Sequence, residues 1–311
     1  MPSNRPVTAL RHLAILAVPA LLVGCAAPCD YGTGNTLPVH ESASLPVVPV
    51  SLNDHRAPFL LDTGATTTTL LPEGAKALGL QTDQLRSTRS IGIGGETRGQ
   101  NVLLARLRVG SQEVRQLTLP VAGHTTGEGQ RRLAGLLGAD FLRINEVDLD
   151  IPGRQVVLHD QRRCVAGDPP WSGSYDTLPL QVLSNGWLRL DVRINNRTLP
   201  ALLDTGAAGS LVSPDTAREL GAPEAVLSGP PAGRALGIGT EEMELRAWRN
   251  VTLEVGQDRL EGVTLGIATL PEDLPFKVIL GQDYLGSRHL WISYATRRLF
   301  VQRQPVQPRR S

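Results

Sequence analysis

Leu60-Leu61-Asp62-Thr63-Gly64-Ala65 returns as Leu202-Leu203-Asp204-Thr205-Gly206-Ala207, at an offset of 142 residues (204 − 62 = 142). Matches continue on both sides of this hexapeptide and keep their order. They pair Val50 with Val192, Asn53 with Asn195, Pro58 with Pro200, Pro72 with Pro214, Gly79 with Gly221, and Leu137-Gly138 with Leu280-Gly281. The offset drifts by only a few residues along this series, as short loop insertions would cause. The chain therefore contains an internal duplication.

The duplication divides most of the chain into two lobes. The first repeat covers residues 45–160 and the second covers residues 178–303. Residues 161–177 are rich in Gly, Pro and polar side chains, so we expect them to form the linker between the lobes. Residues 304–311 are then a short C-terminal tail.

The pattern within each repeat predicts a mainly β fold. Apolar residues alternate over 47–52 and 188–194, which is typical of strands with one buried face. The turn-forming pairs Asn53-Asp54 and Asn195-Asn196 follow these strands. Further elements are expected as strands at 59–62, 102–109 and 251–255, as short helices that begin with Pro at 72–78 and 214–220, and as single helical turns at 139–143 and 282–285.

The amino-acid composition limits the classes of function that the chain can have. The 311 residues are 41% hydrophobic, which is enough for real cores and excludes a disordered chain. The 31 basic and 30 acidic residues give a formal charge of +1, so no charge excess argues for nucleic acid or for an anionic membrane surface.

The N-terminus has the pattern of a secretion signal. Arg5 and Arg11 precede an apolar run over 13–24, which is too short to span a bilayer. The run ends in Leu22-Val23-Gly24-Cys25, which resembles a bacterial lipobox. This resemblance implies that residues 1–24 are a lipoprotein signal peptide and that Cys25 carries the lipid, with residues 25–44 as a linker. An ordinary signal peptide cleaved near Ala26 or Ala27 is the alternative.

The lipoprotein interpretation places the protein on the periplasmic side of a bacterial envelope, anchored in the membrane by lipid chains. Ala26 follows the cysteine, and by resemblance to bacterial sorting rules the absence of Asp there favours the outer membrane. The other two cysteines, Cys29 and Cys164, could form a disulfide in an oxidising periplasm, but the sequence neither demands nor excludes it.

Three motifs, in the same order in both halves, carry a family resemblance. The Asp-Thr-Gly hexapeptides resemble the active-site turn of retroviral and pepsin-like aspartic proteases. Gly92-Ile93-Gly94-Gly95 and Gly237-Ile238-Gly239 resemble the glycine-rich flap of the retroviral enzymes. The apolar-apolar-Gly segments ending at Gly138 and Gly281 resemble the segment that packs across the active-site loop in this family. The resemblance implies two tandem retropepsin-like β-barrel lobes that form a pepsin-like bilobal pseudo-dimer in one chain.

The chemistry of peptide hydrolysis explains why the motif is present twice. In this family a water molecule is activated between two carboxylates, of which one is ionised and the other protonated. Each Asp-Thr-Gly turn supplies one carboxylate, so Asp62 and Asp204 are the expected catalytic pair. We expect Gly64 and Gly206 to be glycines because the turn needs backbone φ values barred to other residues. By the resemblance, Thr63 and Thr205 bond across the axis to the opposite loop.

The flap motifs imply that hairpin tips close over an extended polypeptide substrate. Their glycines would let each tip bend. The second tip continues as Thr240-Glu241-Glu242, which is more acidic than the first, so closure is expected to depend mainly on the first flap. Neither tip carries the tyrosine of pepsin-like enzymes, which places the chain closer to the retroviral type.

Other polar residues have structural interpretations. We expect the repeated Asp140 and Asp283 to be caps or ion-pair partners of short helices, and Asp148 and Asp150 to lie on a solvated strand edge. The histidines show no ligand spacing, so no metal site and no cofactor are predicted.

Two alternatives stay open at this stage. The lobes could bind a peptide or glycan without cleaving it, and each lobe could pair with a lobe of another chain instead of within a monomer.

Overall fold

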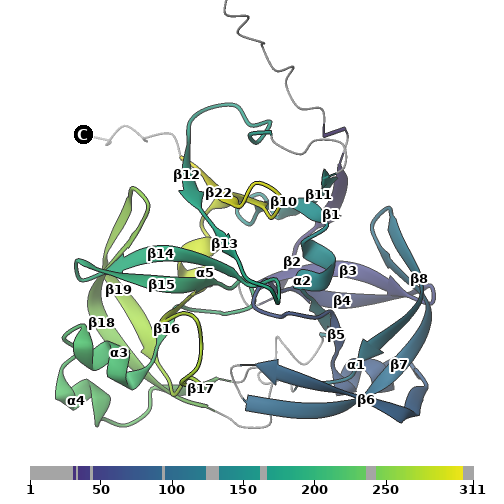
Figure 1. Ribbon diagram of the computed structural model, residues 1–311, viewed down its shortest axis with the longest axis horizontal. Coiled ribbons are helices and arrows are strands. Elements are labelled where there is room, and N and C mark those ends of the chain that lie inside the picture. Colours follow the sequence, from purple (N-terminus) through teal and green to yellow (C-terminus); the bar gives the residue numbers. More distant parts are fainter. Residues whose placement is uncertain are drawn as a thin grey trace, which may run out of the picture.

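The computed structural model describes residues 31–32, 34–42, 45–92, 95–123, 133–161, 167–235 and 243–303. Over these residues the chain forms two β lobes that lie side by side, with a third sheet across both of them (Figure 1). The predicted fold class, mainly β with two tandem acid-protease lobes, is confirmed. The expected signal peptide, Cys25, Cys29, Cys164 and the tail 304–311 lie outside the described residues, as do Ile93, Gly94, Gly237, Ile238 and Gly239 of the flap motifs.

Each lobe is built on an eight-stranded sheet. The first has the order β5-β9-β4-β3-β7-β6, with β2 paired to β3 and β8 to β7. Its strands are β2 (His40–Ser42), β3 (Leu45–Leu52), β4 (His55–Leu61), β5 (Thr69–Leu70), β6 (Thr82–Gly92), β7 (Gly95–Val109), β8 (Gln112–Pro120) and β9 (Gly135–Leu137). The second has the order β13-β14-β15-β20-β16-β19-β18-β17. Its strands are β13 (Gln181–Val182), β14 (Leu188–Ile194), β15 (Arg197–Leu203), β16 (Leu211–Val212), β17 (Gly233–Ala235), β18 (Met243–Val255), β19 (Asp258–Ile267) and β20 (Val278–Leu280).

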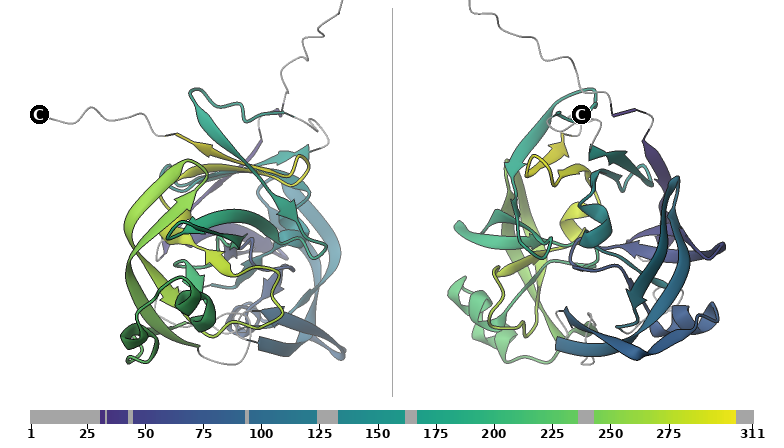
Figure 2. Two further views of the ribbon diagram at one scale, coloured as in Figure 1. Left: turned by 60° about the vertical axis from the view of Figure 1, so that its left-hand side comes forward. Right: turned by 45° about the vertical axis from the view of Figure 1, so that its right-hand side comes forward.

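The third sheet joins the lobes and has six strands in the order β1-β11-β10-β21-β22-β12. These are β1 (Asn35–Pro38), β10 (Asn145–Asp150), β11 (Gln155–Asp160), β12 (Tyr175–Pro179), β21 (His289–Ser293) and β22 (Arg298–Gln302). Figure 2 shows this sheet above the two lobes in both views. Because β10 from the first repeat pairs directly with β21 from the second, the two halves meet through main-chain hydrogen bonds within one chain.

The expected linkers are only partly linkers. Residues 35–38 and 40–42, within the segment 25–44, form β1 and β2, and β12 already begins at residue 175, inside the segment 161–177. The sequence signal failed here because these strands are short and lie in segments whose Pro and Gly content is typical of loops. Asp148 and Asp150 were also placed wrongly on a solvated edge, because β10 lies at the centre of the six-stranded sheet.

The leading hairpin of each lobe forms where the alternation predicted it. Asn53 and Asp54 both take positive φ values of 46° and 73°, and Asn195 and Asn196 take 47° and 68°. Two successive residues with positive φ make the tight hairpin turn that suits the right-handed twist of the strands, and Asn and Asp tolerate this conformation better than most residues.

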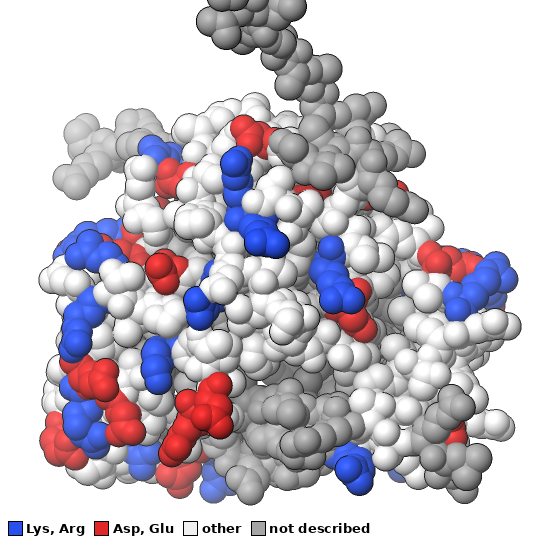
Figure 3. Space-filling model, in the orientation of Figure 1, with Lys and Arg blue, Asp and Glu red and all other residues white. Residues whose placement is uncertain are grey.

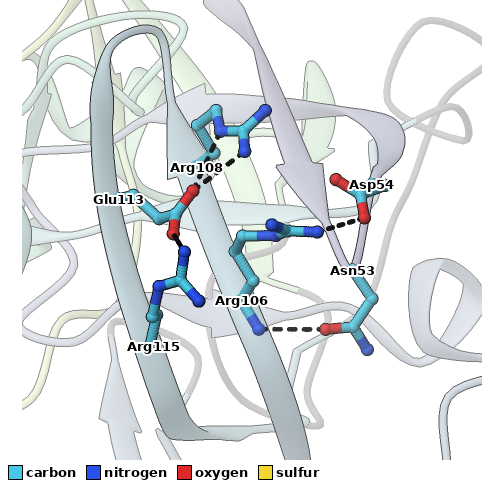
Figure 4. A network of polar contacts seen from close by, with 6 residues as sticks. All are labelled: Asn53, Asp54, Arg106, Arg108, Glu113 and Arg115. Carbon is cyan, nitrogen blue, oxygen red and sulfur yellow. Dashed lines mark hydrogen bonds and ion pairs between the residues drawn. The ribbon is translucent and has the colours of Figure 1, made fainter.

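The first of these turns is fixed by the neighbouring strands (Figure 4). The Asn53 side chain accepts a hydrogen bond of 3.0 Å from the backbone N–H of Arg106, and Asp54 pairs with the guanidinium of the same arginine. The second turn repeats the first contact, since Asn195 accepts from the backbone N–H of Thr252 at 3.1 Å. Beside the first turn, Glu113 bridges Arg108 and Arg115, but surface pairs of this kind add little to stability.

The helices are short, as expected. They are α1 (Pro72–Ala77), α2 (Ala139–Leu142), α3 (Pro214–Glu219), α4 (Glu224–Leu227) and α5 (Gln282–Leu285). α1 and α3 each begin with Pro at the first turn, and Gly79 and Gly221 follow them with φ of +59° and +90°. The helices at 72–78 and 214–220 are thus confirmed within a residue.

The core is aliphatic, in keeping with the low aromatic content. The largest apolar cluster runs through both lobes and consists mainly of Leu, Val, Ile and Ala. The aromatic residues that are fully buried include Phe59, Tyr284, Trp291 and Phe300. On the face shown in Figure 3, basic and acidic side chains are interspersed and no field of one sign forms. Among the described residues, no helix is long and apolar enough to cross a membrane.

Candidate active site

The two Asp-Thr-Gly loops start at equivalent places in the lobes. β4 runs parallel to β9, and the backbone N–H of Asp62, just past the end of β4, donates to the Leu137 carbonyl at 3.0 Å. In the second lobe β15 runs parallel to β20, and the N–H of Asp204 donates to the Leu280 carbonyl at 3.0 Å. Each aspartate is therefore held at the end of a buried strand by the apolar-apolar-Gly segment that the sequence singled out.

Thr63 and Thr205 lock the two loops together. The Thr63 hydroxyl donates to the Leu203 carbonyl at 2.6 Å and accepts from the N–H of Thr205 at 3.1 Å. The Thr205 hydroxyl donates to the Leu61 carbonyl at 2.6 Å and accepts from the N–H of Thr63 at 3.0 Å. Both threonines are 0% exposed. The contact across the axis that the resemblance implied is therefore present in the structure, with four reciprocal bonds.

The structure brings the carboxylates of Asp62 and Asp204 together; they are called the aspartate pair below. The N–H groups of Gly64 and Ala65 donate to one oxygen of Asp62 at 2.8 and 3.0 Å. Gly206 and Ala207 do the same for Asp204, at 2.8 and 3.1 Å. Each carboxylate is thus oriented by two backbone donors from its own turn, which holds it in place and stabilises its charged form.

The reason for Gly64 and Gly206 differs from the one expected. Neither has a positive φ, so the turn itself does not demand glycine. A Cβ atom on Gly64 would lie 2.5 Å from the carboxyl carbon of Asp204, and a Cβ on Gly206 would lie 2.5 Å from that of Asp62. These positions must be glycine because the opposite carboxylate occupies the space that a side chain would need.

Burial and mutual repulsion favour a shared proton. Asp204 is 5% exposed, and Asp62 is partly exposed. Burial raises the pKa of Asp62, although the N–H donors of Gly64 and Ala65 oppose this. Burial also raises the pKa of Asp204 well above its usual range, and the charge of Asp62 raises it further. Ionisation of one carboxylate therefore opposes ionisation of the other, which favours a pair that shares one proton.

A second layer of hydrogen bonds supports each loop. The Thr68 hydroxyl donates to Asp140 at 2.7 Å and accepts from the N–H of Gly138 at 3.1 Å. Ser210 takes the same place in the second lobe, since its hydroxyl donates to Asp283 at 2.7 Å and accepts from the N–H of Gly281 at 3.1 Å. Asp140 and Asp283 were predicted as caps or ion-pair partners of the short helices. They do accept from N–H groups in the first turns of α2 and α5, Phe141 at 2.8 Å and Tyr284 at 2.9 Å. The sequence did not show that the same carboxylates also bind Thr68 and Ser210 of the active-site loops.

Three residues near the pair were not identified from the sequence. The indole N–H of Trp187 donates to the Gly64 carbonyl at 2.7 Å, from the second lobe to the first. The Gln282 amide donates to the Thr205 carbonyl at 2.8 Å. Tyr294 is 7% exposed, and its pKa is raised by burial and by the charge of Asp62. Gln282 and Trp187 replace Ala139 and Leu45 of the first repeat, so a comparison of the two repeats position by position could have singled them out.

The flap motifs lie on hairpins, although their tips are not described. β6 and β7 pair along most of their length up to Gly92 opposite Gly95. In the second lobe, the described residues of β17 and β18 pair from Gly233 to Ala235, opposite Leu245 to Met243. Figure 1 shows both hairpins at the lower edge of the molecule, one from each lobe. The hairpin of each lobe thus leads to its flap motif, and the expectation that the first flap is the main one stays a prediction.

A cavity of about 740 Å³ lies elsewhere in the described part of the chain. Its lining includes Tyr31, Phe141, Ile144 and Leu158, and none of the residues of the two Asp-Thr-Gly loops. Within the described ranges, no group of three or more His, Cys, Asp or Glu side chains could hold a metal ion. The aspartate pair is therefore the candidate site on its geometry and not on the size of a cavity.

Comparison with known proteins agrees with this geometry. Residues 48–141 match a family model described as "Aspartyl protease", and residues 190–287 match one described as "gag-polyprotein putative aspartyl protease". A search of the curated proteins found no match. Among solved structures, the aspartic proteinase from Irpex lacteus is similar in fold, with a TM-score of 0.55 and 12% sequence identity over 86% of this chain and 96% of that chain. Each lobe of the chain thus contains one aspartyl protease family domain.

Proposed function

We propose that the protein is an aspartic endopeptidase in which Asp62 and Asp204 together activate a water molecule. The observation that carries this proposal is the reciprocal threonine contact, which holds two carboxylate turns face to face within one chain. A monomer could then be active, because both carboxylates and both supporting glycines are present in the same molecule.

The proposed reaction uses the shared proton directly. The ionised carboxylate takes a proton from water as the water oxygen bonds to the scissile carbonyl carbon. The protonated carboxyl gives its proton to the carbonyl oxygen, which forms a neutral gem-diol. The C–N bond then breaks as the amide nitrogen receives a proton from the carboxyl group that took it from water. The other carboxylate takes a proton from one gem-diol hydroxyl as the carbonyl re-forms, so the pair again carries one proton. The turn N–H groups keep both carboxylates oriented throughout.

The flaps would hold the substrate. A polypeptide in extended conformation could add main-chain hydrogen bonds to the hairpins that carry Gly92 and Gly95 in one lobe and Gly233 to Ala235 in the other. The flap motifs themselves, including Ile93 and Ile238, are proposed to close over the peptide and exclude water. No cofactor is needed for this chemistry.

The decisive experiment is cleavage of denatured casein by the purified protein, with Asp62→Asn, Asp204→Asn and the double variant. Each single variant should abolish cleavage, and the double variant should be hardly worse, because residues that act in one step are not additive. Pepstatin should inhibit the wild type. If one single variant keeps most of its activity, the two aspartates do not act as one unit.

The competing proposal is a module that binds peptide or glycan without cleaving it. It predicts no cleavage products by mass spectrometry, but retained binding of a peptide library by both Asn variants. Profiling of cleavage sites on the same library separates the two functions and also gives the specificity of the enzyme.

We also propose that the enzyme faces the periplasm as a lipid-anchored monomer, most simply in the outer membrane. The support is the lipobox that ends at Cys25 and the folding of both lobes within one chain. Sedimentation of the mature protein distinguishes this monomer from an assembly in which lobes pair between chains.

A further inference from the structure

Each Asp-Thr-Gly loop accepts a hydrogen bond from a side chain of the second lobe. The indole N–H of Trp187 donates to the Gly64 carbonyl at 2.7 Å. The side-chain amide of Gln282 donates to the Thr205 carbonyl at 2.8 Å. The first of these bonds crosses from one lobe to the other, and the second stays within its own lobe. The second lobe therefore contacts both loops through the side chains of these two residues.

The first repeat has no side-chain donor at either of the equivalent positions. These are Leu45 (187 − 142 = 45) and Ala139 (282 − 143 = 139). The main chain, in contrast, is alike in the two repeats. The N–H of Ala139 donates to the Ala65 carbonyl at 2.8 Å, and the N–H of Gln282 donates to the Ala207 carbonyl at 2.9 Å. The glutamine amide is thus an addition to a link that the backbone already makes in both lobes.

The two bonded carbonyls belong to peptide groups that also hold the aspartate pair. The Gly64–Ala65 peptide accepts from the indole and donates its N–H to Asp62 at 3.0 Å. The Thr205–Gly206 peptide accepts from the glutamine amide and donates its N–H to Asp204 at 2.8 Å. A peptide group that accepts a hydrogen bond at its oxygen is polarised and donates more strongly at its nitrogen. Each carboxylate is therefore bound by one backbone donor that a side chain of the second lobe strengthens.

Trp187 is held in place by its surroundings. It lies at the end of the turn that joins β13 to β14, which is closed by hydrogen bonds of 2.9 Å between Leu183 and both Gly186 and Trp187. A Cβ on Gly186 would lie 2.8 Å from Ala139 of the first lobe, so the turn is seated directly on that lobe. The indole also packs edge-on against Phe276, with ring centroids 5.5 Å apart. The indole N–H is therefore directed at the loop by packing on both sides.

Gln282 is a buried residue whose side chain is only partly satisfied. It is 5% exposed, and among the described residues its Oε1 atom has no hydrogen-bond partner. An unsatisfied buried acceptor lowers the stability of a protein. Stability alone therefore does not explain a glutamine at this position, where the first repeat has alanine.

We propose that Trp187 and Gln282 are a pair of positioning residues, each of which strengthens, through one peptide group, a backbone donor to one carboxylate of the aspartate pair. A stronger donor stabilises the charged form of the carboxylate that it binds. The two bonds therefore lower the apparent pKa values of the pair and oppose the effect of burial, but they do not decide which carboxyl carries the proton. The inference rests on the proposed shared-proton pair.

Other titratable groups of the described chain lie beside the pair or its loops. Burial and the charge of Asp62 raise the pKa of Tyr294, so its phenol stays neutral in the working range. Asp140 and Asp283 are bonded to hydroxyl groups of the two loops. Because substitution of the indole or of the glutamine amide removes none of these groups, a change in the titration of the pair can be assigned to the two donors.

The proposal can be tested by NMR without any substrate. Carboxyl carbons labelled with ¹³C in the aspartates report ionisation of the pair, and the spectra of Asp62→Asn and Asp204→Asn assign the signals. Trp187→Phe keeps a ring against Phe276 and removes the N–H, and Gln282→Ala restores the residue of the first repeat. Each should raise the apparent pKa values of the pair by roughly 0.1–0.7 unit, as expected for loss of the cooperative part of one charged hydrogen bond. The double variant should raise them further.

Two matched controls remove the same chemical groups elsewhere. Trp171→Phe removes an indole N–H that donates to Asp148. Gln161→Ala removes an amide that donates to the carbonyls of Arg143 and Asn145. Both controls should leave the titration of the pair unchanged. Melting temperatures are recorded for every variant, because a loss of packing alone would lower the melting temperature without moving the titration.

A residue whose variant titrates like the wild type is structural only, and the proposal is overturned for that residue. It is overturned for both if the controls shift the titration as much as Trp187→Phe and Gln282→Ala do. If Trp187→Phe does not fold, Gln282→Ala decides, since both donors act through a peptide group in the same way. A protein that shows the expected shifts but cleaves no peptide would contradict the proposed function and leave the positioning role standing.

Discussion

Asp148 of β10 and Trp291 of β21 lie directly opposite each other in the six-stranded sheet, and they are also equivalent positions of the two repeats (291 − 148 = 143, the offset of Leu137 and Leu280). The flanking pairs are consistent with this. Glu146 faces Ser293 and Asp150 faces His289. At the same offset, His289 is the equivalent of Glu146 (146 + 143 = 289) and Ser293 is the equivalent of Asp150 (150 + 143 = 293), so the two pairs are related by the same symmetry. The pseudo-two-fold axis that relates the lobes therefore passes between Asp148 and Trp291. The two residues on the axis are chemically unlike, so this sheet is symmetric in its backbone only.

The Asp148 side chain uses this central place to bind the second lobe. Its carboxylate lies 2.6 Å from Nε2 of His289, and the two side chains are 14% and 22% exposed. Burial lowers the pKa of His289, but the hydrogen bond and charge of Asp148 outweigh it, and the net shift is upward. A raised histidine pKa stabilises the fold fully below its unfolded value of about 6.5, and this stabilisation is lost as the pH rises through the folded value.

We therefore expect Asp148→Asn to lower the free energy of unfolding by about 1.5–3 kcal/mol at pH 5.5 and by only about 0.5–1.5 kcal/mol at pH 9. Urea unfolding at the two pH values measures this difference. Asp54→Asn is the control, because Asn stands at the equivalent position 196 and Asp54 pairs with Arg106 at the surface. Equal losses for Asp148→Asn at both pH values would show that His289 is not charged in the fold.

The threonine contact predicts a large and chemically specific stability loss. Thr63→Val removes the partner of two buried groups, the Leu203 carbonyl and the Thr205 N–H, and each unsatisfied group costs about 1–3 kcal/mol. The free energy of unfolding should fall by roughly 2–5 kcal/mol, whereas Thr63→Ser should keep most of it. Thr67→Val, at an exposed position of the same loop, should change stability by less than about 0.5 kcal/mol. A serine variant as unstable as the valine variant would contradict this account.

Much of this fold and site could be predicted because the duplication supplies an internal comparison. The order of matches around Asp62 and Asp204 identified both loops, both leading hairpins and helices α1, α2, α3 and α5. Periodicity alone would not have done so, since a lone Asp-Thr-Gly usually marks a turn.

What could not be predicted lies where the repeats pair with each other or differ. The strands β1 and β12 were taken as linkers because they become strands only by pairing with β11 and β22, far away in sequence. The role of Gly64 was misread because the sequence does not show that the carboxylate of Asp204 occupies the space beside it. Trp187 carried no signal by itself, since a tryptophan at the start of a strand usually serves packing.

Gly64 lies so close to the Asp204 carboxylate that the addition of a single methyl group at this position should reduce activity. In Gly64→Ala the new Cβ would lie 2.5 Å from the Asp204 carboxyl, so the two carboxylates must separate. We expect kcat/KM to fall by about 100-fold or more, because a displacement near 1 Å has that effect on positioned groups. Gly206→Ala should behave alike. In Gly209→Ala the added Cβ would have no neighbour within 4 Å, so activity should be nearly unchanged. If Gly64→Ala keeps full activity, the loops do not approach each other as the structure has them.

The alanines after the two motifs predict a mildly acidic optimum. Pepsin-like enzymes usually carry Ser or Thr where this chain has Ala65 and Ala207, and that hydroxyl can bond a carboxylate and lower its pKa. Here both carboxyl pKa values are raised, so the optimum for kcat/KM should lie at roughly pH 4.5–6.5. Ala65→Ser with Ala207→Ser should move it to lower pH, by about one unit for each 1.4 kcal/mol of new hydrogen bonding. A wild-type optimum below about pH 3, or an upward shift in the double variant, would rule out this role for the alanines.

The lipobox predicts that attachment to the membrane depends on the thiol of Cys25. Cys25→Ser should release the protein from the membrane fraction or block its maturation, because a lipid cannot be attached to serine by the same route. Fractionation and the mass of the N-terminal peptide measure the two effects. If the wild-type peptide carries no acyl mass and fractionation is unchanged by the substitution, the protein is not a lipoprotein.

The register of β10 against β21 has a consequence for how the protein can change over evolutionary time. Because each half presents the same backbone edge to the other, two copies of one half-length chain could pair in this way, as an isologous dimer. In such a dimer every substitution appears on both sides of the axis at once. Joining the halves removes that constraint. Asp148 could then diverge from Trp291, Leu45 from Trp187, and Ala139 from Gln282. The last two differences give each Asp-Thr-Gly loop a hydrogen-bond donor that has no counterpart at the equivalent position of the other repeat. A covalent join between the two halves is thus what allows the surroundings of two aspartates with one ancestor to evolve separately.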